Sequence, residues 1–308
     1  MRWLTLSSLM LVSSVFAQQK SGIRVDTLLN DRWNVQQAVF DVEANKVLVV
    51  SEINERNTLF ILEPGKSKLL KPGFTNGALQ SANWDRNPEK LIASSAENGQ
   101  LYQLDGQNWQ YLLADRDVSA AYPVFNHSGN LLLFEGMRAN QQNSSLFTYD
   151  FVYHNLNELA LTKNCQNPQW SPSDELISCT SGQDEDTEIA LYHWYGAVYG
   201  LIKSDTLALR DACWTESDYR LIFVGEGKQF NYVLSSRKDG TDLKVLFSST
   251  TKLSRPSRIN GHDQLLLLQQ TSTNRTQLLR IYLDEQSVQN HVNIKNLNHE
   301  SATRRIQF

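Results

Sequence analysis

The chain has 308 residues, of which 41% are hydrophobic and 10% aromatic, so it can build a packed core and is not disordered as a whole. Its net charge is −4, and no run of adjacent Lys and Arg residues is longer than two. A broad basic surface is therefore excluded, and we expect no nucleic-acid partner.

The first 17 residues predict a signal peptide. Arg2 supplies a positive charge, residues 4–15 form an apolar stretch, and Val15-Phe16-Ala17 fits the small-x-small pattern of a cleavage site. An N-terminal membrane anchor is the alternative, but the stretch is too short to cross a bilayer of about 30 Å. No Cys follows it, which disfavours a lipid anchor. We expect cleavage near Ala17, a periplasmic or secreted mature chain and no membrane span.

After an N-terminal segment (18–33), a repeat of about 44 residues runs through the rest of the chain. Each unit has a large apolar anchor residue, a polar turn and then a short apolar run. The anchors are Phe40, Trp84, Phe125, Trp170, Trp214 and Ile259, separated by 44, 41, 45, 44 and 45 residues. A period of this length indicates a repeat architecture. The units span about 34–75, 76–117, 118–163, 164–207, 208–252 and 253–295, and a C-terminal tail (296–308) follows.

Every unit also contains two further strand-like runs. The first of these lies at 58–62, 100–104, 145–149, 189–193, 232–235 and 277–283; the second lies at 68–70, 109–113, 158–162, 200–203, 243–247 and 287–294. Together with the anchor strand and the apolar run after the turn, they make four strands per unit. Six such units predict an all-β fold, a six-bladed β-propeller with four-stranded antiparallel blades. The anchors are then expected to fill the wedges between blades.

The segment "NPQWSPSDELISC" around Trp170 resembles the opening hairpin of the PD40 (WD40-like) repeats of the TolB propeller family. Two later segments, with Asp239-Gly240 and Asp105-Gly106 at their turns, are similar to the end of such a repeat. The resemblance covers residues 34–295, and it implies a six-bladed, exported propeller. TolB also has a separate N-terminal domain, for which residues 18–33 leave no room.

Closing the ring requires a strand that covers the open edge of the last blade. Two segments have the right character, "GIRVDTLL" (22–29) and "RRIQF" (304–308), and the sequence does not choose between them.

The three cysteines make neither a Cys-x-x-Cys pair nor a metal-ligand spacing with His. Pairing of the strands around Trp170 would place Cys165 opposite residue 180, beside Cys179, so a disulfide between these two is one candidate. Cys213 is expected to be a buried thiol.

No motif for nucleophilic, phosphate-binding or zinc-dependent catalysis is found in the sequence, and the histidines are expected to lie apart. We therefore assign no catalytic residue, no metal and no cofactor.

Candidate binding residues lie where the second strand of a blade leads into its third, on the face where these loops gather around the central opening. A ring of carboxylates there would focus negative potential, although solvated strand ends would show the same pattern. The full candidate set is Glu52, Arg56, Glu97, Glu135, Met137, Arg138, Asp184, Asp186, Glu226, Lys228 and Arg275.

Three functions remain open, and the plainest of them is an envelope protein whose propeller serves only as a spacer. Of the other two, the first is a non-enzymatic, monomeric scaffold of the cell envelope that binds a protein or peptide. The second is a propeller enzyme or glycan-binding protein, of the lyase, lactonase or glycosidase class, that uses the central mouth. Fold alone does not separate them.

Overall fold

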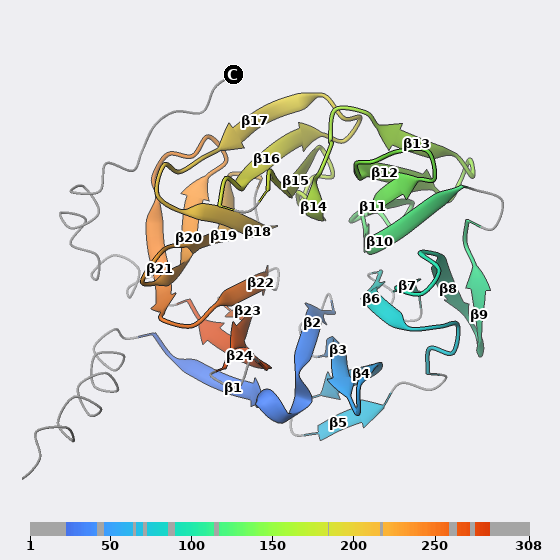
Figure 1. Cartoon of the computed structure of the whole chain (residues 1–308), viewed down its shortest axis with the longest axis horizontal. Coiled ribbons are helices and arrows are strands. Elements are labelled where there is room, and N and C mark those ends of the chain that lie inside the picture. The colour runs from blue at the N-terminus through green and yellow to red at the C-terminus, as the bar shows by residue number, and fades with distance from the viewer. Residues whose placement is uncertain are drawn as a thin grey trace, which may run out of the picture.

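Six small antiparallel sheets stand in a ring around a central channel in the computed structural model (Figure 1). The structure describes residues 23–41, 46–63, 66–69, 73–85, 90–113, 117–183, 185–215, 218–258, 264–271 and 275–283. Each sheet has four strands, and the described helical structure is one short 3-10 turn, η1 (Asp31–Trp33). The predicted all-β, six-bladed propeller is confirmed. Within the described residues, no helix has the length and apolar character needed to cross a bilayer.

In the first five blades the strands follow one another in chain order from the channel outward. Blade 1 contains β2 (Val35–Phe40), β3 (Val47–Ile53), β4 (Arg56–Glu63) and β5 (Lys66–Leu69). Blade 2 contains β6 (Leu79–Trp84), β7 (Leu91–Ser95), β8 (Leu101–Asp105) and β9 (Asn108–Tyr111). Blade 3 contains β10 (Val118–Phe125), β11 (Leu131–Arg138), β12 (Ser145–Asp150) and β13 (Leu156–Leu159).

Blade 4 contains β14 (Gln166–Trp170), β15 (Leu176–Ser181), β16 (Glu188–His193) and β17 (Val198–Ile202). Blade 5 contains β18 (Ala208–Trp214), β19 (Arg220–Glu226), β20 (Asn231–Arg237) and β21 (Lys244–Ser249). We call the end of the ring with the turns between first and second strands, such as residues 171–175, the hairpin face. The opposite end, with the turns between second and third strands, such as residues 54–55, is the loop face.

The sixth blade is completed by the N-terminal segment. Its sheet has the order β1 (Val25–Leu29), β24 (Thr276–Tyr282), β23 (Gln264–Gln270) and β22 (Leu253–Arg258). The Tyr282 hydroxyl donates to Asp26 at 3.0 Å, and the Arg24 guanidinium lies 4.5 Å from the centre of the Tyr282 ring. The segments 287–294, expected as a strand of this blade, and 304–308, the other closing candidate, lie outside the described residues.

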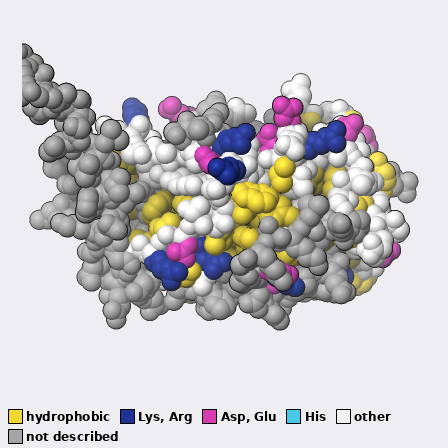
Figure 2. Space-filling view, turned by 90° about the horizontal axis from the view of Figure 1, so that it is seen from below, with side chains coloured by type: hydrophobic (Ala, Val, Ile, Leu, Met, Phe, Trp, Pro, Cys, Tyr) yellow, Lys and Arg dark blue, Asp and Glu magenta, His cyan; other side chains and the backbone are white. Residues whose placement is uncertain are grey.

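The flank of the ring that carries β1 and β5 shows hydrophobic side chains along its middle and charged side chains toward both rims (Figure 2). The outer strand β1 has only five residues and carries the ion pair of Arg24 with Asp26 at its start, and short, charged edges discourage pairing with other chains.

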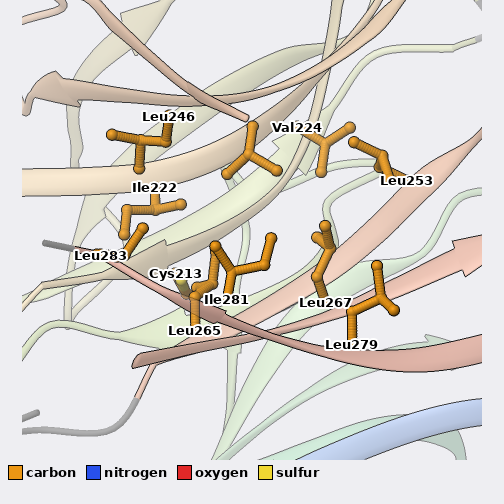
Figure 3. Close-up of a cluster of buried hydrophobic side chains, with 11 residues drawn as sticks. Cys213, Ile222, Val224, Leu246, Leu253, Leu265, Leu267, Leu279, Ile281 and Leu283 are labelled. Carbon is orange, nitrogen blue, oxygen red and sulfur yellow. The ribbon is translucent and has the colours of Figure 1, made fainter. Parts of the chain in front are cut away.

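The core is divided among the junctions between blades. Each of six hydrophobic clusters of described residues combines side chains from two neighbouring blades. Figure 3 shows the cluster between blades 5 and 6, where Ile222 and Val224 of β19 face Leu265 and Leu267 of β23. A four-stranded sheet has two apolar faces, and the ring covers both because every blade has two neighbours.

Five of the six predicted anchors end an inner strand and are buried: Phe40, Trp84, Phe125, Trp170 and Trp214. The two tryptophans Trp84 and Trp170 also donate their indole N–H to the preceding blade, to the carbonyl oxygens of Phe40 at 2.7 Å and Val124 at 3.2 Å. These contacts fix the angle between adjacent blades.

In the sixth blade, strand register places Arg258 at the anchor position. It pairs with Leu265 as Trp214 pairs with Leu221, and both residues end their inner strands. The predicted sixth anchor, Ile259, lies outside the described residues.

Carboxylates of the opening hairpins join adjacent blades at the hairpin face. Asp174 of blade 4 accepts hydrogen bonds from the backbone N–H groups of His127 (2.8 Å) and Ser128 (3.2 Å), and its Oδ1 lies 2.9 Å from the His127 ring nitrogen. Asp218 of blade 5 accepts in the same way from the backbone and hydroxyl of Ser173. The Asp of one hairpin thus holds the hairpin of the preceding blade.

All three cysteines are free and buried in this structure, and Cys165 and Cys179, the pair considered for a disulfide, interact with each other. The inner strand β14 has a bulge between Gln166 and Gln169, and Gln166 is the residue that lies opposite Thr180. Cys165 precedes the strand and lies within reach of the Tyr192 hydroxyl, at 3.8 Å. Burial raises the pKa of Cys213 to about 12, so it is an inert thiol.

Candidate functional site

Each inner strand of the propeller contains a bulge, and in blades 3 to 6 it is built on one strained residue. The four residues have left-handed backbone φ angles although none is glycine: Tyr122 (51°), Asn167 (51°), Asp211 (53°) and Arg255 (50°). In each case two inner-strand residues lie opposite one residue of the second strand. This conformation costs roughly 1–2 kcal/mol per residue for most side chains. Such strain concentrates at functional sites.

These four residues, which we call the channel ring, occupy one repeat position, three residues before the end of each inner strand. A proline follows three of them, at Pro123, Pro168 and Pro256. Proline has no N–H to donate to a ladder, and a bulge is one of the few places in a sheet where it is tolerated. The local sequence therefore accounts for the break in pairing that turns these side chains to the channel.

Asp211 connects three blades. One of its oxygens accepts from the Asn167 side-chain amide at 2.7 Å and the other from the Arg255 backbone N–H at 3.0 Å. Its own backbone N–H donates to the Thr180 hydroxyl at 2.9 Å. Only 8% of the surface of Asp211 is exposed, and the hydrogen bonds that its two oxygens accept offset the free-energy cost of burying the carboxylate.

Arg255 reaches across the channel. Its guanidinium carbon lies 4.7 Å from the centre of the Tyr122 ring, although the two residues belong to the sixth and the third of six blades. The inner strands β22 and β10 lie on opposite sides of the centre of the ring (Figure 1). The pair forms a bar across the channel, and a cation over an aromatic face is a stabilising arrangement.

Glu135 of β11 lies near this bar. Burial raises its pKa from an ordinary value of 4.5 to about 7, while a hydrogen bond with Ser144 and the positive charge of Arg255 act in the opposite direction. Near neutral pH the side chain therefore exists in both protonation states, which is the property required of a general acid or base.

Two connected cavities follow the channel from the ring to the hairpin face. The inner one has a volume of about 80 Å³ and is lined by the four channel-ring residues together with Gln37 and Asn83. The outer one, of about 210 Å³, is lined by the anchors and by Asp41, Asp85, His127, Thr215 and Arg258. They share Val39, Asn83, Val124, Gln169 and Ser257, so the channel widens continuously toward the hairpin face.

The sequence instead predicted the binding mouth at the loop face, with a ring of carboxylates from the strand ends. In the structure these carboxylates have different partners and different degrees of exposure. Glu52 accepts from the Asn34 side-chain amide at 2.9 Å, and Glu226 pairs with Arg210 at 3.0 Å and Lys252 at 3.7 Å. Glu97 is exposed, whereas Glu135 is the group described above. Among the described residues, no three His, Cys, Asp or Glu side chains are grouped as a metal site would require.

The remaining candidates form no cluster. Arg138 pairs with Glu158 at 3.1 Å and lies over the Phe147 ring at 5.4 Å, and its neighbour Met137 is 39% exposed. The other exposed candidates belong to separate turns and strand ends: Arg56, Asp186, Lys228 and Arg275. Asp184 lies outside the described residues.

The channel ring was not among the predicted site residues, although a signal for it exists. Asn167-Pro168 lies inside the hairpin motif around Trp170, and the same offset gives Tyr122-Pro123 and Arg255-Pro256. A position that keeps its spacing from the anchor but changes its chemistry from blade to blade is a sign of a site rather than of packing.

Taken together, fold and site define a six-bladed β-propeller with a polar, constricted central channel. No protein-family model matches the sequence, and no curated protein matches it either. Solved structures do match the fold. A gluconolactonase of Xanthomonas campestris has a TM-score of 0.67 at 12% identity, covering 88% of this chain and 93% of its own.

Two further structures have the same fold. TolB of Acinetobacter baumannii has a TM-score of 0.54 at 14% identity, covering 88% of this chain and 68% of its own. An oligogalacturonate lyase in complex with manganese has a TM-score of 0.60 at 11% identity, covering 88% and 96%. The chain thus has a TolB-like propeller fold, which enzymes of different activities share.

Proposed function

We propose that this protein is a binding protein of the cell envelope whose propeller receives a segment of a protein partner in its central channel. The observation that carries the proposal is the channel ring, in which Tyr122, Asn167, Asp211 and Arg255 hold strained conformations at one level of the channel. Tyr122 and Arg255, unlike Asn and Asp, adopt this backbone conformation only at a cost, and a propeller that served only as a spacer would gain nothing from that cost.

The shape of the channel supports a segment rather than a folded domain. The outer cavity offers an entrance at the hairpin face, and the inner cavity ends at the bar formed by Arg255 and Tyr122. An extended chain end or a loop tip can enter such a space. The apolar N-terminal stretch with its cleavage pattern supports export, and we propose a monomer in the periplasm or outside the cell.

A second candidate function is an enzyme or glycan-binding protein that uses the same channel. The observation in its favour is Glu135, the pKa of which burial raises to about 7, close to the charge of Arg255. General acids and bases are tuned in this way. Because a gluconolactonase and an oligogalacturonate lyase have similar folds, a lactone and a sugar acid are the substrates to test for this candidate.

A comparative pull-down from envelope extract tests the proposal. The full exported chain is the bait, beside a channel variant (Tyr122→Ala with Asn167→Ala) and a loop-face variant (Met137→Ala with Arg138→Ala). We expect one partner that the native and loop-face baits recover and the channel bait loses. Equal recovery by all three baits would contradict a channel site. No specific partner, together with turnover of a lactone or a sugar acid that Glu135→Gln abolishes, would establish the enzyme instead.

A further inference from the structure

Arg255 brings a set of unused hydrogen-bond donors into the channel. Its backbone N–H is bonded to Asp211, but within the described part of the chain no acceptor takes a hydrogen bond from its guanidinium, and no carboxylate lies within 4.0 Å of it. A guanidinium has five N–H donors in a planar fork. The guanidinium carbon lies over the Tyr122 ring at 4.7 Å, and both residues line the inner cavity.

The acidic groups near the channel are engaged elsewhere. Asp211 accepts hydrogen bonds from the Asn167 side chain and the Arg255 backbone. Asp41 accepts one from the backbone N–H of Lys46 at 2.9 Å. Asp85 lies 3.8 Å from the ammonium group of Lys90. None of these three pairs with the Arg255 side chain. Glu135 feels the positive charge of Arg255, but within the described residues no ion pair of 4.0 Å or less joins the two side chains.

We propose that the inner cavity binds a carboxylate and that Arg255 is the residue that recognises it. A carboxylate has two oxygens that match the edge of a guanidinium in a pair of parallel hydrogen bonds, and this geometry is both strong and selective. The Tyr122 ring holds the guanidinium in the cavity through a cation–π contact, and the cavity also offers the side-chain amides of Gln37 and Asn83.

The size of the cavity limits what can carry that carboxylate. About 80 Å³ holds a few water molecules or one small polar group, since a water molecule takes roughly 30 Å³. A glutamate or aspartate side chain, a chain terminus or a small free acid fits, with the rest of the ligand in the outer cavity. This inference rests on the proposed function, because it assumes that the ligand enters through the channel. It adds the chemical group that the channel recognises, a carboxylate.

Isothermal titration calorimetry with matched probes tests the carboxylate. The full chain is titrated with a nine-residue peptide that has one Glu among Gly and Ser residues and blocked termini, with its Gln twin, and with glutarate. We expect the Glu peptide to bind at least tenfold more tightly than the Gln twin. Equal binding of the two peptides, or no binding of either the Glu peptide or glutarate, would overturn the proposal.

Variants assign the role to Arg255. Arg255→Gln should weaken binding of the Glu peptide at least tenfold, and Arg255→Lys should restore part of it. Arg237→Gln, at the exposed end of β20, is the matched control and should leave binding unchanged. Unfolding temperatures measured alongside show that each variant is folded. An Arg255→Gln variant that is folded and binds as the native chain does would contradict the inference.

The outcomes separate this inference from the proposed function. Glutarate that binds through Arg255, while the Glu peptide does not bind, would keep the carboxylate site and exclude a peptide ligand. An envelope partner that native and Arg255→Gln baits recover equally would keep the scaffold and exclude the carboxylate site.

Discussion

The propeller repeats two positions around its channel, and they differ in kind. The anchor position holds aromatic residues in five blades, among them Trp84 and Trp170, and these are buried between blades. Three residues earlier, the channel position holds Tyr122, Asn167 and Asp211 in successive blades, followed by Arg255 in the sixth. The first position keeps its aromatic chemistry in five blades, and the second keeps its left-handed backbone in four while its side chain changes.

This difference indicates which features of a repeat protein concern folding and which concern recognition. Packing between blades makes the same demand at every junction, so the same kind of side chain recurs. A ligand in a channel approaches each blade differently, so the side chains that meet it diverge. The following predictions test this contrast, from the largest expected effect to the smallest.

Loss of an anchor should affect folding. Trp170, only 4% exposed, contributes to the junction between blades 3 and 4, and Trp170→Ala should lower the free energy of unfolding by about 3–5 kcal/mol in denaturant titration. Trp194, 50% exposed, is the matched control, and Trp194→Ala should change it by less than about 0.5 kcal/mol. Equal losses in the two variants would remove the basis for the anchor assignment.

Neutralising Glu135 should stabilise the protein at high pH. Burial raises its folded-state pKa from 4.5 to about 7, so native stability should fall as pH rises through this interval. Glu135→Gln should therefore gain on the order of 2 kcal/mol at pH 8 and nothing near pH 4. Urea titrations at both pH values measure this, with exposed Glu97→Gln as the control. A gain that is the same at both pH values would disprove a buried, titrating carboxyl group.

Removing the hairpin carboxylate should have a smaller effect with the opposite pH dependence. Partial burial raises the pKa of Asp174, but its hydrogen bonds with His127 and Ser128 outweigh this, and the pKa lies below the ordinary 3.8. Its contribution is present above that value and is lost as pH falls through the folded-state pKa. Asp174→Asn should cost about 1–2 kcal/mol at pH 7, and this cost should shrink as the pH falls below 3.8.

Thermal melts over a series of pH values below 4 measure this, with exposed Asp186→Asn as the control. A loss of stability that does not change with pH across the series would show that Asp174 acts through its shape and not through its charge.

Relaxing the channel ring should separate stability from recognition. Glycine adopts a positive φ without strain, so Arg255→Gly should raise the free energy of unfolding by about 1 kcal/mol relative to Arg255→Ala. Neither variant should bind the Glu peptide. A glycine variant that is no more stable than the alanine variant would show that the backbone at residue 255 is not strained.

The architecture could be predicted from the sequence because the repeat arises from the packing of large apolar residues between blades. The spacing of Trp84, Trp170 and Trp214 reflects a demand that every junction shares, and the structure has the six four-stranded blades that this spacing indicates. Closure by β1 could not be chosen in advance, since residues 22–29 and 304–308 have the same strand-like pattern.

The channel was harder to predict, because contacts across a ring have no local pattern. Arg255 and Tyr122 are far apart in sequence, and only the closed ring brings the guanidinium over the aromatic ring. Likewise the raised pKa of Glu135 follows from burial at a blade junction, which strand periodicity does not reveal. Acidic residues at strand ends, such as Glu52 and Glu226, were easier to notice in the sequence. In the structure they pair with nearby polar or basic side chains, Asn34 and Arg210.

The most direct test of the central claim, that recognition belongs to the channel position, is the dissociation constant of the Glu peptide for the native chain and for Arg255→Gln. We predict a difference of at least tenfold while the two proteins unfold at the same temperature to within a few degrees. Equal dissociation constants, or a weakening that is matched by a large fall in unfolding temperature, would contradict the claim.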